Sequence, residues 1–331
     1  MHRTLRILIN QFMRRYSSVN QLSKETFEGC VLSIGMFDGV HLGHKQVIDT
    51  CCRIAQKNNL KSVLITFSNH PSEYLSSDIN VKLLSTLDEK IKHLSNTLLD
   101  ILIVLPFDLK MASLSAKDFI ENILIRKLNC KVIIFGYDNH FGKNRQGSPE
   151  YINFHYGEKI KTIVVKEKKI NAEIISSSRI KELIDIGNIA LANQFLGYNY
   201  TVHSEVVHGN KLGRTIGFPT ANYDLRKNTK VLPCPGVYLT NNILETHDGI
   251  KNIIGLTNVG YKPTVTSSTN LSIETHLIDF DADIYGYKIE SQFICRIRSE
   301  RKFNSLDELK TQIILDKKVV LDNLTKIHVA T

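Results

Sequence analysis

The chain has 331 residues, of which 42% are hydrophobic and 23% charged, and its formal net charge is +9. At roughly 150 residues per domain this length predicts two domains of ordinary globular composition. A membrane-spanning protein is excluded, because no run approaches the roughly 18 consecutive apolar residues that a spanning helix needs. The six cysteines include no C-x-x-C pair, which argues against a zinc or redox motif and favours reduced thiols.

The first 18 residues are basic. They contain Arg3, Arg6, Arg14 and Arg15 and no acidic residue. We interpret them as an ordinary lead-in to the first strand, with a mitochondrial transit peptide as the alternative. A cytoplasmic protein is therefore expected, and an organellar location is the minor alternative. Elsewhere the basic residues are spread along the chain without an aromatic repeat, which suits phosphate binding better than nucleic-acid binding.

The first half alternates short apolar runs with helical patterns. Strands are predicted at 31–34, 62–67, 101–105, 131–136 and 161–165, and helices at 44–57 and 116–127. In the first of these helices, Val47, Ile48, Cys51, Ile54 and Ala55 fall on one face. Continuous apolar strands that alternate with helices indicate an α/β fold with a parallel sheet covered on both faces.

The second half has a different pattern. Short helices are predicted at 178–186 and 189–196 around Gly187, where we expect the domain boundary. Short alternating strands follow at 202–207, 236–240, 253–257, 272–278 and 292–297, separated by glycines, and predict an antiparallel β-barrel. A final helix is predicted to start at Ser305, with Glu308 completing a capping box.

Residues 35–44 follow the first strand with the sequence G-M-F-D-G-V-H-L-G-H. Glycines allow a close approach of the backbone to a ligand. His41 and His44 flank Gly43 at the start of a helix, where amide donors and the helix dipole favour a phosphate. Either histidine alone would be taken for a solvated loop residue. The full spacing favours a nucleotide-transfer site in which two imidazoles donate to phosphate oxygens.

This segment resembles the G-x-F-D-G-V-H-x-G-H element of the bacterial FAD synthetases, which belong to the H-x-G-H nucleotidyltransferases. Residues 66–71, 135–142 and 175–181 are similar to the family's T-F-x-x-H-P, G-x-D-F-x-F-G and I-S-S-T-R-I-R elements. The resemblance implies a Rossmann-like nucleotidyltransferase domain with His41 and His44 as catalytic residues. It also implies ATP and phosphate binding at Gly35, Phe37, Asp38, Gly43, Ser177, Ser178 and Arg179, and flavin binding at Asn69, His70, Pro71, Asp138, Phe141 and Arg145.

The most informative run of the second half is 207–222. It is rich in glycine and carries Lys211 and Arg214, the composition of a phosphate cradle, although the Walker spacing is missing. The Thr220 hydroxyl and the Asn222 amide are oxygen donors suited to a magnesium ion that carries ATP. Taken alone, the run would also fit a flexible hairpin turn.

The run resembles the G-x-x-x-G-R-x-x-G-F-P-T-A-N motif of the riboflavin kinases. Residues 235–238, 258–265, 273–280 and 283–286 are similar to the family's P-G-V-Y, N-x-G-x-x-P-T-x, V-E-x-H-L-x-D-F and D-L-Y-G elements. The resemblance implies that Glu274 is the general base for the ribityl hydroxyl. Thr220 and Asn222 would hold Mg²⁺, and ATP would bind Gly209, Lys211, Gly213, Arg214, Gly217, Pro219 and Thr220.

Together these resemblances imply an FMN adenylyltransferase domain at 1–186 and a riboflavin kinase barrel with a C-terminal helix at 187–331. The expected substrates are riboflavin, FMN and ATP, with Mg²⁺ as cofactor. We expect no nucleic-acid or membrane partner, and a monomer or weak homo-oligomer. One alternative is a kinase whose adenylyltransferase half has decayed, motivated by departures from the family patterns at Asn139, His140 and Lys181. Another is a non-catalytic flavin-binding or RNA-associated regulator.

Overall fold

The computed structural model describes residues 13–21, 28–72, 81–209, 212–262 and 270–329. The chain divides into two compact units, Met1–Ser177 and Ser178–Thr331. Within the described residues, no helix combines the length and apolar character that crossing a bilayer requires.

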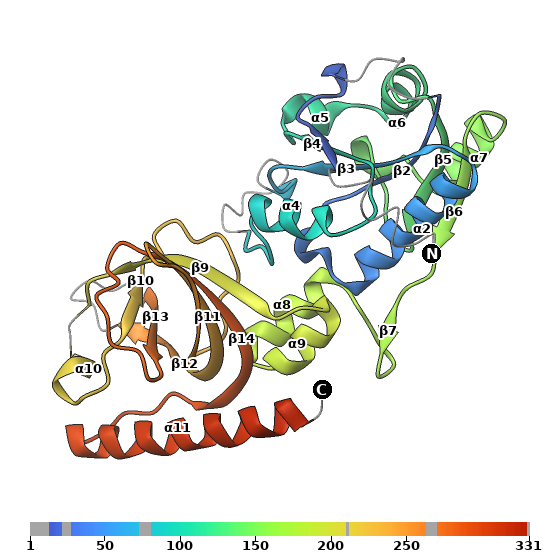
Figure 1. Cartoon of the computed structure of the whole chain (residues 1–331). Coiled ribbons are helices and arrows are strands. Elements are labelled where there is room, and N and C mark those ends of the chain that lie inside the picture. Colours follow the sequence, from blue (N-terminus) through green and yellow to red (C-terminus); the bar gives the residue numbers. More distant parts are fainter. Residues whose placement is uncertain (1–12, 22–27, 73–80, 210–211, 263–269, 330–331) are drawn as a thin grey trace, which may run out of the picture. The chain divides into compact units, whose positions relative to one another are not determined.

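The first unit is built on a six-stranded sheet with strand order β1-β4-β3-β2-β5-β6 (Figure 1). All its strand pairs are parallel. Its elements are β1 (Arg14–Tyr16), η1 (Val19–Gln21), β2 (Cys30–Ile34), η3 (Asp38–Val40), α2 (Leu42–Lys57), β3 (Lys61–Phe67), α4 (Leu87–Ser95), β4 (Ile101–Leu105), α5 (Leu109–Ser113), α6 (Ala116–Asp118), η4 (Phe119–Ile125), β5 (Cys130–Gly136), η5 (Lys143–Arg145), α7 (Pro149–Tyr156), β6 (Lys161–Val165) and the hairpin β7 (Lys169–Ile170) and β8 (Glu173–Ile174).

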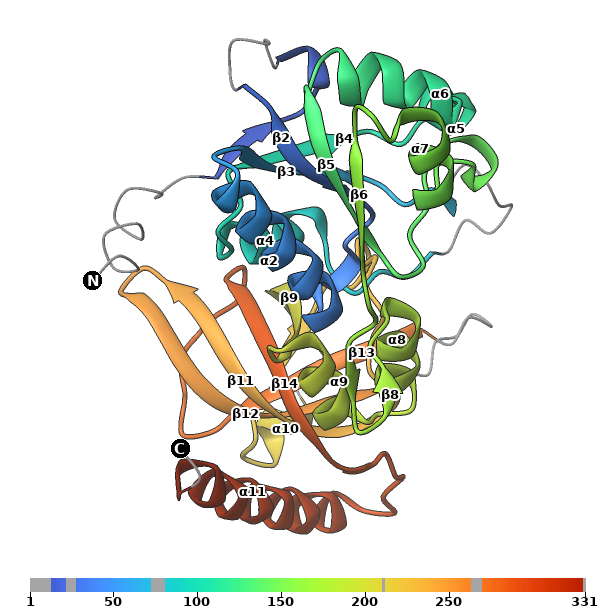
Figure 2. The same cartoon turned by 90° about the vertical axis from the view of Figure 1, so that its right-hand side faces the viewer.

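Both faces of this sheet are covered by helices (Figure 2). On one face, Ile48 of α2 and Leu94 of α4 share a buried cluster with Leu64 of β3. On the other, Phe119 of η4 and Ile152 of α7 are buried with alternate residues of the same strands. Every residue of β2 and β4 is buried, which explains why β4 is continuously apolar and why the one polar residue of β2, Ser33, donates its hydroxyl to the Ile134 carbonyl at 2.9 Å. The predicted parallel sheet is confirmed.

Two local features of this unit differ from the sequence-based expectation. The helix expected at 116–127 is α-helical only in α6 and continues as a π-helical segment, η4. At the end of this segment Arg126 N donates to Glu121 O at 3.1 Å, a bond to the residue five positions earlier, which is the π-helical spacing. The basic lead-in contains a strand, β1, which pairs in parallel with β4 and places Arg14 opposite Ile101. Polar β1 has no apolar alternation to reveal it, and it exists because β4 offers a free edge.

The second unit is a closed antiparallel barrel with strand order β10-β13-β12-β11-β14-β9, so the predicted barrel is confirmed. One of its strands, β10, was not among the predicted strands. Its elements are α8 (Ser177–Asp185, which starts at the last residue of the first unit), α9 (Ile189–Leu196), β9 (Tyr200–Val207), α10 (Leu212–Thr215), β10 (Ala221–Tyr223), β11 (Gly236–Thr246), β12 (Gly249–Lys262), β13 (Asn270–Leu277), β14 (Lys288–Ser299) and α11 (Leu306–Val329).

A closed ring of side-chain hydrogen bonds fills part of the barrel interior. Hydroxyl contacts of 2.8 Å link Thr240 to Thr257 and Thr257 to Thr275, and Thr275 donates to the Tyr223 hydroxyl at 3.0 Å. From there the bonds run through Ser291 to Asn242 and back to Thr240. Every member is buried, and burial is tolerated because each polar group has a partner. Gly255 leaves room for the ring, because a Cβ there would lie 2.5 Å from Asn242 Nδ2.

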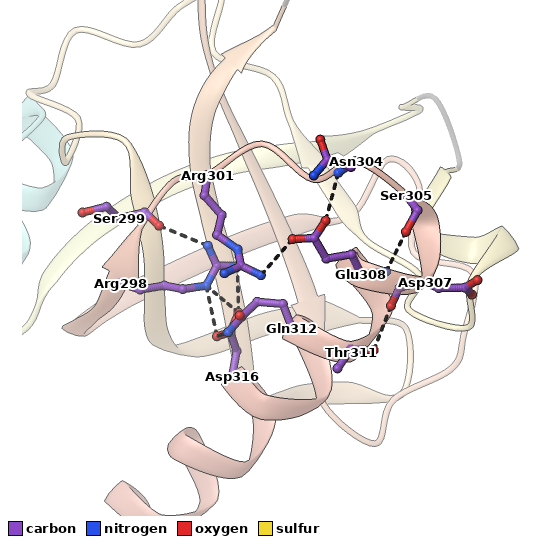
Figure 3. A network of polar contacts seen from close by, with 10 residues as sticks. All are labelled: Arg298, Ser299, Arg301, Asn304, Ser305, Asp307, Glu308, Thr311, Gln312 and Asp316. Carbon is purple, nitrogen blue, oxygen red and sulfur yellow. Dashed lines mark hydrogen bonds and ion pairs between the residues drawn. The ribbon is translucent and has the colours of Figure 1, made fainter.

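Helix α11 lies along the outside of the barrel, where Val320 is buried with Val237 and Leu239. A network of polar contacts joins the helix to the end of β14 (Figure 3). The guanidinium of Arg298 binds the carboxylate of Asp316. Its Nε donates to Oδ1 at 3.0 Å and to Oδ2 at 2.9 Å, and its Nη2 forms an ion pair with Oδ2 at 2.9 Å.

The start of α11 is capped by Ser305, whose Oγ accepts from Glu308 N at 3.2 Å. The Glu308 carboxylate accepts from Asn304 N at 3.0 Å instead of from Ser305 N. The predicted capping box is therefore half formed, with its second hydrogen bond displaced by one residue (Figure 3).

Candidate functional site

A cavity of about 670 Å³ opens in the first unit where β2, β3, β4 and β5 end. The carboxyl ends of parallel strands share one edge of a sheet, so the segments that follow them meet there. The volume lies in the range of roughly 300–1,000 Å³ that is typical of small-molecule sites. The predicted site residues that line it are Gly35, Phe37, Asp38, His44, Pro71, Asp138, Phe141, Arg145 and Ser177.

One wall of the cavity is apolar, and apart from Phe67, which belongs to the 66–71 element, its residues lie outside the sequence motifs. It includes Phe67, Phe107, Met111 and Leu114, from the ends of β3 and β4 and from α5 and the residue after it. The rings of Phe67 and Phe107 meet edge to face with centroids 5.2 Å apart. Such a wall suits a flat aromatic ligand. The available signal was position alone, because Phe107 follows a buried strand that ends at this edge.

His41 and His44 stack on each other with ring centroids 3.6 Å apart. His41 caps α2, since its Nδ1 accepts from His44 N at 3.2 Å. Gly43 makes room for this ring, because a Cβ there would lie 3.1 Å from it. Of the two rings, that of His44 lines the cavity, and its buried Nδ1 has no hydrogen-bond partner among the described residues. An unpaired buried nitrogen is costly, and such costs are typical of functional sites.

Both imidazoles are held in the neutral form. Burial lowers the pKa of His41 to about 4, against an opposing effect of Asp38. Burial, followed by the effects of His41 and Lys90, lowers the pKa of His44 well below its usual value. At neutral pH each ring therefore has one N–H to donate and does not act as a cation.

The carboxylate of Asp38 is engaged inside the protein. It accepts from Leu84 N at 2.9 and 3.1 Å and from Ser85 N at 3.1 Å. Ser85 Oγ in turn accepts from Gly39 N at 3.0 Å, and Ser177 Oγ donates to the Asp38 backbone carbonyl at 3.0 Å. Asp38 thus anchors the loop that surrounds the cavity.

Four predicted residues, His41, Gly43, Asn69 and His70, are not among those that line the cavity. The Asn69 amide exchanges two hydrogen bonds of 2.9 Å with the backbone of Phe107, and so joins the segments after β3 and β4. His70 Nδ1 accepts from Ser72 N at 3.2 Å. Asn69 thus helps to position Phe107, which lines the cavity.

Of the three departures from the family patterns, Asn139 and His140 line the cavity and Lys181 does not. The Asn139 amide donates to the Ile34 carbonyl at the end of β2. Arg145 donates to His140 Nδ1 at 3.2 Å and to the Asp138 carbonyl at 3.0 Å. His140 therefore helps to hold the guanidinium at the rim of the cavity.

Ser178 and Arg179 belong to the second unit, in the first turn of α8. The Arg179 guanidinium forms an ion pair of 3.2 Å with Glu182, three residues along the helix. Both side chains of this pair are exposed enough for solvent to weaken it.

On the barrel, Glu274 of β13 stands opposite Asn222 of β10 on one side and Asn258 of β12 on the other. Residues directly paired across antiparallel strands share a face. The next residue, Thr275, belongs to the interior ring, so these three side chains lie on the outer face. A Cβ on Gly209 would lie 2.3 Å from Asn222 Nδ2, so glycine is needed where the chain closes over this row.

The segment before β10 turns sharply and presents Thr220. Gly217, at φ +88°, lies two residues beyond the end of α10, and Phe218 N donates to Gly213 O at 2.8 Å. His276 Nδ1 donates to the Pro219 carbonyl at 2.9 Å. Of the predicted ATP residues, Arg214, Pro219 and Thr220 line a cavity of about 40 Å³. Lys211 and the 263–265 part of the predicted 258–265 motif lie outside the described residues.

The donor set on the barrel fits magnesium. Among the described residues, no group of three or more His, Cys, Asp or Glu side chains could hold a metal ion. Thr220 and Asn222 offer oxygen donors, and Mg²⁺ is commonly held by one or two protein ligands together with nucleotide phosphates. This arrangement suits an ion that arrives with ATP.

Two family models match the chain, that of FAD synthetase over residues 23–179 and that of riboflavin kinase over residues 196–324. A protein of Buchnera aphidicola subsp. Schizaphis graminum, named bifunctional riboflavin kinase/FMN adenylyltransferase, is 38% identical over 93% of this chain and 98% of its own length. The chain belongs to this family. The resemblances recognised in the sequence are thereby confirmed.

Other members of the family align over similar lengths. A Bacillus subtilis protein of the same name is 38% identical over 90% of this chain and 93% of its own length. One from Escherichia coli strain K12 is 36% identical over 92% and 96%. A solved structure titled as a macrolide-efflux protein from Streptococcus pneumoniae covers 93% of this chain with a TM-score of 0.83 at 28% identity, and is covered to 99% itself. The two-domain order of the family thus extends over nearly the whole chain.

Proposed function

We propose that the chain phosphorylates riboflavin to FMN on its barrel and adenylylates FMN to FAD in the cavity of its first unit. One observation carries this proposal: relatives named for both activities align with the chain over nearly its whole length. The apolar wall and the polar loops of the 670 Å³ cavity support binding of a flavin and a nucleotide there.

In the kinase reaction, the ribityl hydroxyl attacks the γ-phosphorus of ATP, and ADP leaves. We assign Glu274 as the base that takes the hydroxyl proton. Thr220 and Asn222 would hold Mg²⁺, which when bound neutralises charge on the phosphates. His276 holds the turn that presents Thr220. The remaining proposed ATP residues are Gly209, Lys211, Gly213, Arg214, Gly217 and Pro219.

In the adenylyl transfer, a phosphate oxygen of FMN attacks the α-phosphorus of ATP, and the bond to pyrophosphate breaks as the new P–O bond forms. We assign His44 as a neutral donor to the oxygen on which charge develops. His41 supports it through ring stacking and the helix cap. The proposed nucleotide residues are Gly35, Phe37, Asp38, Gly43, Ser177, Ser178 and Arg179, and the proposed flavin residues are Asn69, His70, Pro71, Asp138, Phe141 and Arg145.

The proposal is tested by incubating the protein with riboflavin, ATP and magnesium and separating the flavins by chromatography. FAD supports both activities, FMN alone supports the kinase with a decayed second site, and unchanged riboflavin supports a non-catalytic binder.

Two variants test the kinase assignments. Glu274→Gln should lower FMN formation by about 100- to 10,000-fold, the usual cost of losing a general base. Its FAD formation from supplied FMN should be unchanged. Thr220→Ala should be partly rescued by more magnesium-ATP. Rescue of Glu274→Gln under the same titration would show that the carboxylate acts in binding and would overturn its assignment as base.

We also propose a cytoplasmic monomer or weak homo-oligomer that acts on small molecules alone. An organellar location, with residues 1–18 as a transit peptide, is the alternative. Cell fractionation and sedimentation velocity test these two points.

A further inference from the structure

Helix α4 carries a buried lysine that belongs to none of the sequence motifs. Lys90 is 5% exposed. Its Nζ donates to the Phe67 carbonyl at 3.0 Å and reaches Thr66 Oγ1 at 3.5 Å. The Thr66 hydroxyl donates to the Met36 carbonyl at 3.0 Å. One ammonium group thus joins α4, the end of β3 and the loop after β2, and both Phe67 and Met36 line the 670 Å³ cavity.

The charge of Lys90 has no carboxylate in direct contact within the described part of the chain. Burial lowers its pKa to about 8, and Asp38 of η3 raises it. The group is therefore charged at neutral pH. The charged or titratable groups that act on it are Asp38, itself buried, and His44 of α2, whose pKa the lysine lowers. The positive charge is thus close enough to act electrostatically on the buried carboxylate and the cavity histidine.

The folding of the unit does not account for this residue. Lysine is almost never fully buried unless it is paired, and an ammonium removed from water without an ion-pair partner destabilises the folded state. An unbranched apolar side chain such as methionine would occupy the same space without that cost. We expect the benefit at the adjacent cavity, whose lining includes Asp38 and His44.

We propose that Lys90 is a positioning residue for adenylyl transfer, which ties the loop after β2 to the end of β3 and supplies positive charge behind Asp38 and His44. The inference rests on the proposed FMN adenylyltransferase activity. Lys90 acts through the loop and through His44, and it does not touch the substrates.

The test compares Lys90→Met with Lys92→Met, the same change at an exposed position of the same helix. In the full-length protein, Lys90→Met should lower kcat for FAD formation by about 100-fold, the cost typical of misplaced reacting groups. Riboflavin phosphorylation by the same preparation should be unchanged, and Lys92→Met should match the wild type in both reactions. The melting temperature of Lys90→Met should be equal to or above that of the wild type, because a buried charge is removed.

The pH profile separates this role from a merely structural one. Wild-type FAD formation should decline above pH 8 as Lys90 loses its proton. This alkaline limb should be absent from Lys90→Met. It should also be absent from Lys90→Arg, because arginine keeps its charge throughout this range and retains part of the activity.

Several results would overturn the proposal. One is wild-type FAD formation by Lys90→Met, and another is a lowered melting temperature with an unchanged pH profile. An alkaline limb that persists in Lys90→Arg would also count against it. A wild-type protein that makes FMN and no FAD would overturn the proposed function, and this inference with it.

Discussion

Acidification from pH 7 to pH 5 should destabilise the first unit through His41. Its pKa is about 4 in the folded protein because the ring is buried. In the unfolded chain it is about 6.5. Below pH 6.5 the unfolded chain therefore takes up a proton that the folded chain does not, so the stability present above pH 6.5 is lost as the pH falls. Linkage gives a loss of about 2 kcal/mol between pH 7 and pH 5, and about 3 kcal/mol by pH 4.

The variant His41→Asn isolates this effect. Asparagine is a good residue at a helix N-cap and can accept from His44 N, as His41 Nδ1 does at 3.2 Å, yet it does not titrate. Between pH 7 and pH 5 the variant should lose about 2 kcal/mol less stability than the wild type. His155→Asn, at an exposed histidine of α7, is the matched control and should follow the wild type.

Stability is measured by pulse proteolysis over a urea series at each pH, with peptides of β2 and β3 reporting on the first unit. Because the two units can unfold separately, this local readout is needed. Equal losses for the wild type and His41→Asn would show that burial does not keep the imidazole neutral, and the reasoning would fail.

Three further results are expected. His44→Ala should lower FAD formation by about 100- to 1,000-fold with FMN formation unchanged, as measured by flavin chromatography, and a loss of only a few-fold would contradict the assignment. Gly255→Ala should lower the unfolding free energy of the barrel by about 1–3 kcal/mol, because the new Cβ would lie 2.5 Å from Asn242 and 2.7 Å from Thr275. Differential scanning calorimetry measures this loss, and an unchanged scan would show that the side chains of the interior ring move aside to make room for the methyl group. A fragment of residues 178–331 should phosphorylate riboflavin and should have a higher melting temperature than a fragment of residues 187–331. The reason is that α8 buries Leu183 and Ile184, and Cys234 N donates to Ile184 O at 3.4 Å. Equal melting temperatures would show that α8 does not stabilise the barrel.

The sequence by itself determined the family, the fold class and most of the regular elements. Strands β4 and β6 and helix α9 have the bounds that periodicity predicted. For β4 this succeeded because burial on both faces of a parallel sheet leaves a continuous apolar run, and for α9 because burial on one face of a helix leaves a stripe. Strands β1 and β10 have three residues each, too few for a pattern, and form because neighbouring strands offer them partners.

The tertiary structure alone decided which side chains meet. A threonine at alternate positions of a strand is usually on the solvent face, and only closure of the barrel turns Thr240, Thr257 and Thr275 inward to hydrogen-bond one another. Within the H-x-G-H motif, packing sends His44 to the cavity and keeps His41 behind it as a helix cap. Lys90 is an ordinary helical lysine in the sequence, and it reaches Phe67 only because α4 packs on β3. Local sequence sets backbone preference and burial, whereas contacts between distant segments arise from the packing of whole elements.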